Sequence, residues 1–334
     1  IDSTAKKMAN DFFKTFSEDC ENLGHGFNGK PMLPPAHRYF EKKHLVVFGA
    51  GYVGGELARQ GLTRGMRVTA LTRNPEKAEQ MREKGIQVVE ADLASHDWHH
   101  QITGDVDFVL NSVSSGGGGV EGYQHSYVEG MRSVVTWAKS REINTFVYTG
   151  STSVYPQDYG AEVTESADTG TENERTARLL HAEKIARESG DFTRWFILRL
   201  SGIYGPNRHH VLNQIRAGGP LAGRSDHRLN LIHRDDICRA IWSVFAAPSE
   251  LRNEVFNVSD DSAVTKCELV EWLASRLQLP CPVFDPKLPS VRRRIVPDRV
   301  IVNRKLKETV GWRPQYPDYR AGYEAILTLV LQPL

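Results

Sequence analysis

Residues 45–54 read Leu-Val-Val-Phe-Gly-Ala-Gly-Tyr-Val-Gly, and a helix-like stretch, Glu56-Leu57-Ala58-Arg59-Gln60, follows them. An apolar run that breaks into glycines at G-x-G-x-x-G spacing predicts a strand, a phosphate-binding turn and a helix. The first glycine allows the tight turn, the second lets the backbone approach a pyrophosphate, and the third lets the helix pack close to the strand. The helix N-terminus adds N–H groups and a partial positive charge. The residues expected to form this site are Gly49, Gly51, Tyr52, Val53 and Gly54.

A glycine turn of this kind also occurs as a plain turn, so the segments after it decide its meaning. The next strand-like run, residues 67–71, ends in Thr72-Arg73-Asn74-Pro75. A fold that prefers NAD usually places Asp or Glu about 20 residues past the glycines, where it binds the ribose hydroxyls. Arg73 stands there instead, and a guanidinium can pair with a 2′-phosphate. Arg73 and Asn74 therefore predict NADP, with NAD less favoured; an exposed arginine at a strand end is the alternative.

A third short strand, residues 88–93, carries Asp92 at its end, followed by Leu93. The carboxylate could accept a hydrogen bond from an adenine amino group, or it could cap the following turn. At the end of the next strand stand Asn111 and Ser112, where a dinucleotide fold approaches the nicotinamide ribose. Gly116–Gly119 then form a loop that serves either as a lid or as a connector.

Strand-like and helix-like runs alternate through residue 200. Strands are expected at about 107–110, 145–148 and 195–198, with helices at 124–141 and 172–188. This alternation predicts βαβ units and a Rossmann-type doubly wound parallel sheet in the α/β class, with its ligand at the carboxyl ends of the strands. Residues 41–200 are the expected nucleotide-binding domain. Residues 201–334, rich in Gly and Pro turns, are the expected smaller α/β substrate lobe, with about 230–246 returning to the first domain.

Charge and hydropathy exclude several kinds of partner. The 334 residues contain 42 Lys and Arg against 41 Asp and Glu, a net charge of +1, which disfavours capture of nucleic acid. The sequence has no uninterrupted apolar stretch of 18 residues, so we expect no membrane insertion.

The cysteines and histidines indicate neither disulfides nor a metal site. Cys20, Cys238, Cys267 and Cys281 are scattered without Cys-x-x-Cys spacing, which is typical of a reducing compartment. The pairs His99-His100 and His209-His210 are adjacent, so their side chains point apart. We predict a soluble protein, either cytoplasmic or, if Ile1 is a processed start, in an organelle matrix or stroma.

Residues 1–40 precede the nucleotide fold and form an extension that we expect to be partly helical. Met8, Phe12 and Phe16 recur four residues apart, which predicts an amphipathic helix over residues 4–19. Such a helix either packs on its own domain or holds a protein partner or second subunit.

The order of these motifs resembles the NAD-dependent epimerase/dehydratase family of extended short-chain dehydrogenases over about residues 44–327. The resemblance also includes Tyr148-Thr149-Gly150-Ser151-Thr152-Ser153-Val154-Tyr155, Leu198-Arg199-Leu200-Ser201-Gly202-Ile203-Tyr204-Gly205-Pro206 and Ile232-His233-Arg234-Asp235-Asp236. It implies a Ser/Thr-Tyr-Lys set beside the nicotinamide and, often, a dimer through two long helices. Here those helices would be 124–141 and 172–188.

Ser151 matches the serine of that set, but Arg175 and Leu179 stand where the tyrosine and lysine belong. Arginine cannot cycle a proton at working pH, and leucine carries no charge that would lower a neighbouring pKa. This departure is similar to the atypical subgroup of the family. Tyr155 is a candidate substitute phenol, and Arg199 and Tyr204 are candidate substrate-binding residues; structural roles are the alternative for each.

Two functions therefore remain open. The first is an NADP(H)-dependent, epimerase/dehydratase-like oxidoreductase acting on a polar, sugar-like small molecule, with Ser151 orienting the reacting oxygen. The second is a non-catalytic NADP(H)-binding sensor or structural subunit of an assembly, stabilised by the nucleotide through mass action.

Overall fold

A seven-stranded sheet, parallel throughout, has the strand order β3-β2-β1-β4-β5-β7-β11. A computed structural model describes residues 39–285, 287–288 and 297–331. The strands are β1 (His44–Phe48), β2 (Arg67–Thr72), β3 (Gln87–Glu90), β4 (Val106–Asn111), β5 (Ile143–Ser151), β7 (Trp195–Leu200) and β11 (Glu254–Val258). The order reverses between β1 and β4, which is the point where open α/β sheets bind ligands. The predicted α/β class and doubly wound sheet are confirmed.

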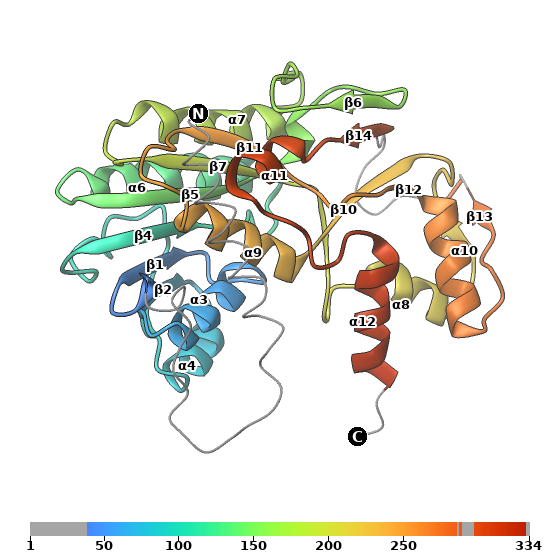
Figure 1. Ribbon diagram of the computed structural model, residues 1–334, viewed down its shortest axis with the longest axis horizontal. Coiled ribbons are helices and arrows are strands. Elements are labelled where there is room, and N and C mark those ends of the chain that lie inside the picture. The colour runs from blue at the N-terminus through green and yellow to red at the C-terminus, as the bar shows by residue number, and fades with distance from the viewer. Residues whose placement is uncertain (1–38, 286, 289–296, 332–334) are drawn as a thin grey trace.

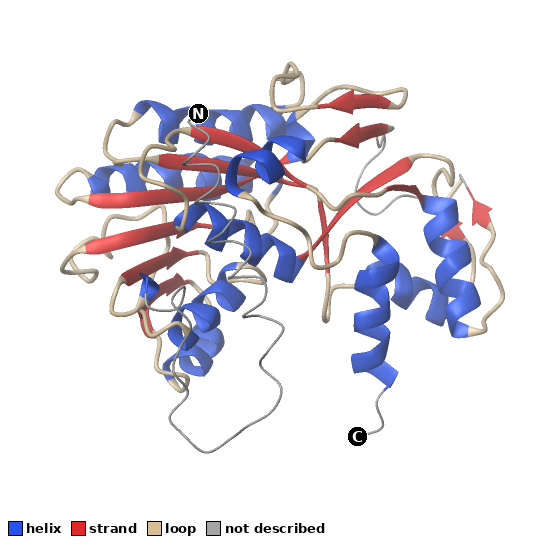
Figure 2. Cartoon of the chain, in the orientation of Figure 1, coloured by secondary structure: helices blue, strands red, loops and turns tan. Residues whose placement is uncertain are grey.

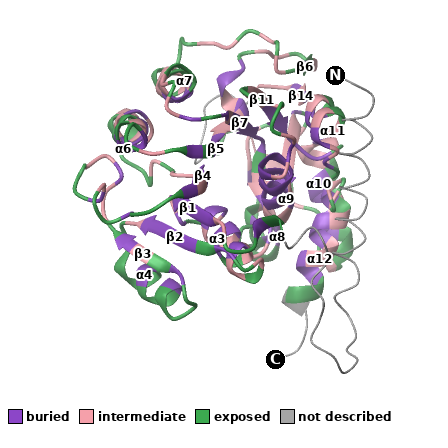
Figure 3. Cartoon of the chain, turned by 60° about the vertical axis from the view of Figure 1, so that its left-hand side comes forward, coloured by how far each residue is buried: buried purple, intermediate pink, exposed green. Residues whose placement is uncertain are grey.

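Helices cover both faces of this sheet because its central strands are apolar on both sides. In β1, Leu45 and Val47 belong to one buried cluster, and Val46 and Phe48 belong to the other. The first cluster contains residues of α3 (Gly54–Thr63), α4 (Pro75–Arg82), α9 (Arg234–Phe245) and α11 (Arg304–Val310); the second contains residues of α6 (Gly130–Ala138) and α7 (Glu174–Glu188). Figure 3 shows the buried strands between helices whose outer faces carry exposed residues.

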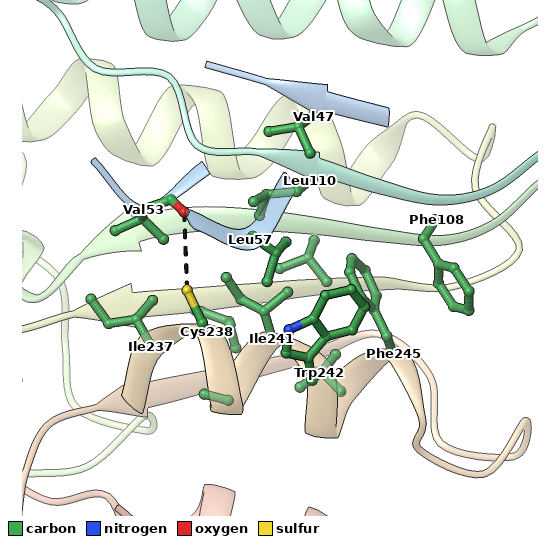
Figure 4. Close-up of a cluster of buried hydrophobic side chains, with 14 of the residues drawn as sticks. Val47, Val53, Leu57, Phe108, Leu110, Ile237, Cys238, Ile241, Trp242 and Phe245 are labelled. Atoms are coloured by element: carbon green, nitrogen blue, oxygen red, sulfur yellow. Dashed lines mark hydrogen bonds between the residues drawn. The ribbon is translucent and has the colours of Figure 1, made fainter. Parts of the chain in front are cut away.

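Helix α9 is distant in sequence from the glycine turn but packs directly against it. Trp242 and Phe245 lie in the same buried cluster as Leu57 of α3 (Figure 4), and the Trp242 indole donates a hydrogen bond of 2.8 Å to Gln60. The Cys238 thiol points to the Val53 carbonyl at 4.0 Å. The segment after residue 230 therefore supports the helix that follows the glycine turn.

The remaining elements form a smaller lobe beside the sheet (Figures 1 and 2). Its parts are β8 (Gly202–Tyr204), α8 (His210–Ala217), β9 (Leu221–Ala222), β10 (Arg228–His233), β12 (Ala263–Thr265), α10 (Lys266–Leu277), β13 (Phe284–Asp285) and α12 (Tyr319–Leu331). Strands β6 (Ala161–Val163) and β14 (Arg299–Ile301) pair above the sheet. Helix α10 begins with a capping box: the side chains of Thr265 and Glu268 each bond to the other's backbone N–H.

The predicted helix at 124–141 begins earlier and is not uniform. It consists of α5 (Gly119–Tyr123), a π-helical segment η1 (Gln124–Glu129) and α6. The predicted extension helix at residues 4–19 lies outside the described residues. Within the part of the chain that the structure describes, no helix has the length and apolarity needed to cross a bilayer.

Candidate functional site

Two adjoining cavities open at the carboxyl ends of the strands. The smaller has a volume of about 370 Å³ and the larger about 660 Å³. Both are lined by Gly51, Ser112, Val113 and Ser114, so they form one continuous cleft at the β1–β4 switch point. Val113 and Ser114 were not predicted, although they directly follow the predicted Asn111-Ser112.

The three glycines differ in what surrounds them. Gly49 has φ +79°, and a Cβ there would lie 2.5 Å from the Val113 backbone nitrogen. A Cβ at Gly54 would overlap the Gly49 carbonyl oxygen, whereas a Cβ at Gly51 would meet nothing within 4 Å. Gly49 and Gly54 are therefore required by the fold, and Gly51 borders open space at the N-terminal side of α3. No side chain caps that helix. This open, uncapped cradle fits a pyrophosphate.

Two basic side chains line the smaller cavity at the end of β2 and the start of α4. Its wall includes Arg73, Asn74 and Lys77. The Asn74 side chain accepts a hydrogen bond of 2.8 Å from the Lys77 N–H, so it caps α4 as well as lining the cavity. Lys77 was missed by the sequence analysis; its place in the first turn after Asn74-Pro75 was the available signal.

Asp92 and Leu93 also line the smaller cavity. One Asp92 oxygen lies 2.8 Å from His125 Nε2 and 3.5 Å from the Arg73 guanidinium, and the other accepts from the Ala94 N–H at 2.9 Å. Partial burial opposes ionisation, but the bonds from His125 and Ala94 outweigh it and lower the Asp92 pKa. Asp92 therefore caps its turn and, as a carboxylate, faces the same space as Arg73.

Asn111 and Ser112 take different positions. Ser112 lines both cavities, but Asn111 is fully buried and belongs to the wall of neither. Its side-chain oxygen accepts from the Val113 N–H at 3.3 Å. Asn111 therefore shapes the loop that borders the cleft and does not reach the cleft itself.

The larger cavity extends from the sheet to the lobe. On the sheet side its wall includes Thr149, Gly150, Ser151 and Tyr127; on the lobe side it includes Tyr204, Asn207, Arg208, His209, His210, Asn213 and Tyr323. Tyr52 and Val53 of the glycine turn line it between these two sides. The Tyr52 hydroxyl donates to the Pro206 carbonyl at 2.8 Å, which joins the turn to the lobe.

Ser151 lies where the sequence placed it, at the end of β5. Its hydroxyl donates to the Ser153 hydroxyl at 2.9 Å and accepts from the Ser153 N–H at 3.2 Å. The side chain is partly exposed to the cavity, so it can exchange its serine partner for a substrate oxygen.

The geometry of Tyr155 and Arg199 does not support their predicted roles. Tyr155 is 2% exposed, and its hydroxyl donates to Asn257 at 2.8 Å and accepts from Arg199 at 2.9 Å. Arg199 is 5% exposed and holds Glu183 of α7 through two bonds of 2.7 and 3.1 Å. Neither lines the smaller or the larger cavity. The polar groups of both side chains are bonded within a buried network that connects β7 to α7.

Tyr204 does line the larger cavity, although it is 3% exposed. Its ring stacks on Tyr323 with centroids 5.1 Å apart, and its hydroxyl points to the Asp318 carbonyl at 3.5 Å. It offers the cavity an apolar ring face and directs its hydroxyl away.

The positions where the family's tyrosine and lysine would stand, Arg175 and Leu179, carry no group that could act as acid or base at neutral pH. Leu179 is buried in an apolar cluster with Val154 and Val163, and the Arg175 guanidinium lies 5.6 Å from the centre of the Tyr123 ring. The only Tyr-x-x-x-Lys pair in the sequence is Tyr39 and Lys43. These residues precede β1, so they lie at the amino-terminal ends of the strands, whereas the cleft lies at the carboxyl ends.

The model of the NAD dependent epimerase/dehydratase family matches residues 45–259. The chain belongs to this family. The match spans the sheet and the start of the lobe, including the whole glycine turn, Ser151 and the β7 segment. Proteins of this family depend on NAD, as the description of the family states.

Individual relatives are similar over nearly their full length. The Escherichia coli K12 protein YeeZ is 26% identical over 294 residues, covering 83% of this chain and 97% of the relative. The low-salt glycan biosynthesis protein Agl12 of Haloferax volcanii is 22% identical over 311 residues, with coverages of 86% and 98%. A solved structure, UDP-glucuronic acid 4-epimerase from Bacillus cereus with UDP-glucuronic acid and NAD, has the same fold, with TM-score 0.72, 18% identity and coverages of 86% and 99%.

Proposed function

We propose that this protein is an NADP(H)-dependent, epimerase/dehydratase-like oxidoreductase that acts on a polar, sugar-like small molecule. The observation that carries the proposal is the single cleft that runs from the glycine turn and Arg73 to Ser151 and the lobe. It joins a dinucleotide cradle to a second space large enough for a small molecule.

The cationic end of the smaller cavity supports NADP over NAD. Arg73 and Lys77 place two positive charges beside the space in which the adenosine ribose of a dinucleotide would lie. A 2′-phosphate pairs with such groups through charge-assisted hydrogen bonds, whereas a ribose hydroxyl gains less from them.

The larger cavity favours a polar substrate without positive charge. Within the described residues, its wall includes no Asp or Glu but includes serine, threonine and asparagine side chains together with Arg208, His209 and His210. Hydroxyl and amide groups of this kind bind sugar hydroxyls. The names of Agl12 and of the Bacillus cereus epimerase point to the same substrate class.

The residues of this chain would divide the work as follows. The glycine turn and the N-terminus of α3 bind the pyrophosphate, and Arg73 and Lys77 bind the 2′-phosphate. A nicotinamide cofactor held there would supply hydride-transfer chemistry. Ser151 holds the oxygen on the reacting carbon, because its hydroxyl can both donate and accept.

A second candidate is a non-catalytic NADP(H)-binding sensor or structural subunit. The observation that favours it is the apolar packing of Leu179 and the Arg175–Tyr123 contact, where the family's lysine and tyrosine would stand. The nucleotide would then stabilise the fold without being turned over.

The test is calorimetric titration of the nucleotide-stripped full chain with NADPH and, separately, with NADH. We expect micromolar or tighter binding of NADPH and a clear preference over NADH. The NADPH- or NADP⁺-loaded chain is then screened against nucleotide-linked and free sugars, following nicotinamide absorbance and product epimers. Binding with no turnover of any sugar favours the non-catalytic candidate; absence of binding contradicts both.

A further inference from the structure

One phenol on the sheet side of the larger cavity was not singled out by the sequence. Four tyrosines line this cavity among the described residues: Tyr52, Tyr127, Tyr204 and Tyr323. Tyr52 donates its proton to the Pro206 carbonyl, and Tyr204 and Tyr323 are stacked against each other in the lobe. Tyr127 alone among the four comes from the helices that cover the sheet, and it shares the cavity wall with Thr149, Gly150 and Ser151.

The backbone around Tyr127 is irregular. It lies in the π-helical segment Gln124–Glu129, between α5 and α6. Single π-turns inside α-helices are uncommon and occur frequently at functional sites, because the inserted residue redirects the side chains around it. Here the π-helical segment lies against α7, the helix on which the family's tyrosine and lysine would stand. Tyr127 packs on the apolar cluster that contains Leu179.

The hydroxyl of Tyr127 keeps its proton available. The Ser115 backbone, in the loop after β4, is a polar neighbour that acts to lower the pKa of this phenol. Among the described residues no acceptor for the Tyr127 O–H is found, and a phenol can donate that proton to an acceptor in the cavity. Ser114, the neighbour of Ser115, lines both cavities, so Tyr127 shares the cavity wall near the junction at which the nicotinamide end of a dinucleotide would lie.

The charges around Tyr127 favour one direction of proton transfer. Burial raises its pKa, the neighbouring Tyr123 adds to this, and the Ser115 backbone opposes it only in part. Tyr148 is buried, and both Tyr127 and Glu183 are among its electrostatic neighbours. None of these neighbours is a cation. The phenol is therefore protonated at neutral pH and is suited to give a proton rather than to remove one.

Given the proposed function, on which this inference rests, we propose that Tyr127 is the proton donor of the site and that the chain works as a reductase. In the step, the carbonyl carbon of the substrate gains a hydride, supplied by NADPH, which is oxidised by two electrons. The carbonyl π bond breaks, and its oxygen takes the Tyr127 proton while Ser151 holds that oxygen. The product is an alcohol, and the phenolate regains a proton from water.

The test uses the full chain with tyrosine labelled by ¹³C at Cζ, because that resonance reports the ionisation of each phenol. Tyr127→Phe identifies the Tyr127 resonance by its loss. Tyr123→Phe is the matched control, since Tyr123 ends α5, just before the π-helical segment, and its ring centroid lies 5.1 Å from that of Tyr127, but it does not line the cavity. Each protein is titrated from neutral to alkaline pH, free and saturated with NADP⁺, with saturation verified by calorimetry.

If Tyr127 lies beside the nicotinamide, the positive ring of NADP⁺ will lower the pKa of that phenol by about one unit, and that of Tyr123 by less. Both variants keep their affinity for NADP⁺. With any carbonyl compound that the wild-type chain reduces, Tyr127→Phe lowers the rate by about 10²–10⁴ and Tyr123→Phe does not.

A Tyr127 resonance that does not respond to bound NADP⁺, or equal rates for the two variants, overturns this inference and leaves the proposed function standing. Loss of NADP⁺ affinity in Tyr127→Phe also overturns it, because the residue would then be structural. Failure of the wild-type chain to bind NADP⁺ contradicts the proposed function itself.

Discussion

Arg73 is the residue that separates NADP from NAD in the proposed site. Its side chain is half exposed, lines the smaller cavity and has Asp92 as an ionic neighbour at 3.5 Å. We expect Arg73→Glu to weaken NADPH binding by well over tenfold and to leave NADH binding little changed. A charged hydrogen-bonded pair contributes about 1.5–3 kcal/mol, and the new carboxylate would also repel the phosphate.

Calorimetry with both nucleotides measures this difference. Lys84→Glu is the matched control, because it makes the same charge change at an exposed position that does not line the cavity. Equal losses of NADPH and NADH affinity in Arg73→Glu would contradict the assignment of Arg73 to the 2′-phosphate.

Arg199 is expected to act on stability rather than on ligand binding. Arg199→Met leaves the Glu183 carboxylate buried without its partner, which typically costs about 3–5 kcal/mol of unfolding free energy. Urea denaturation measures the loss, and Arg59→Met, which breaks the exposed pair with Glu56, should cost less than about 1 kcal/mol. If Arg199→Met instead keeps stability and weakens substrate binding, the role predicted from the sequence would be restored.

Single residues also show where prediction from the sequence stops. The position of Ser151, Arg73 and Gly51 at the cleft could be predicted, because each lies at the end of a strand or in the turn after one. The role of Arg199 could not, because its partner Glu183 stands 16 residues away on α7 and the pairing exists only after α7 packs on β7. An arginine at a strand end looks the same in the sequence whether it meets a ligand or a buried carboxylate.

At the scale of the element, the turn from β1 to α3 combines a structural and a binding function in different glycines. We expect Gly54→Ala to lower the melting temperature, because its Cβ would overlap the Gly49 carbonyl oxygen. Gly51→Ala should melt near the wild-type temperature but bind NADPH more weakly, because its Cβ would enter space that a pyrophosphate approaches. Thermal melts with and without NADPH separate the two effects. A Gly51→Ala protein with undiminished NADPH affinity would contradict the cradle.

Elements with strong local signals were predictable and those shaped by packing were not. The capping box of α10 and the strands of the sheet follow from residue type and periodicity. The π-helical segment Gln124–Glu129 lies inside a stretch predicted as one regular helix. This segment packs against α5, α6 and α7, and no local pattern in the sequence records that packing.

At the scale of the whole molecule, His233 lies where the lobe meets the sheet domain. It is 1% exposed, caps α9 by accepting from the Asp235 N–H at 3.3 Å, and packs on the rings of Tyr204 and Tyr316. A Cβ at Gly205 would lie within 3.3 Å of both the His233 ring and the Tyr52 hydroxyl. The glycine turn, the lobe and α9 therefore converge on this imidazole.

This position predicts a pH dependence of stability. Burial lowers the pKa of His233 to about 4, while in the unfolded chain it is about 6.5. The unfolded chain therefore binds more protons between these values, so this contribution to stability is complete above about pH 6.5 and is lost as pH falls towards 4. The free energy of unfolding that is lost reaches about 3 kcal/mol, because each unit of pKa difference corresponds to about 1.4 kcal/mol.

Urea denaturation between pH 4 and 7 measures this loss in the wild-type chain and in His233→Asn, in which the amide keeps a capping oxygen but cannot titrate in this range. Asp236, whose pKa burial raises to about 6, contributes the opposite slope between its unfolded value and 6, and it is present in both proteins. The difference between the two curves therefore isolates His233.

His210→Asn is the control, because His210 is exposed at the cavity wall. If the free energy of unfolding has the same pH dependence in His233→Asn as in the wild type, the prediction is contradicted. A charged imidazole at position 233 would then not destabilise the junction of the glycine turn, the lobe and α9.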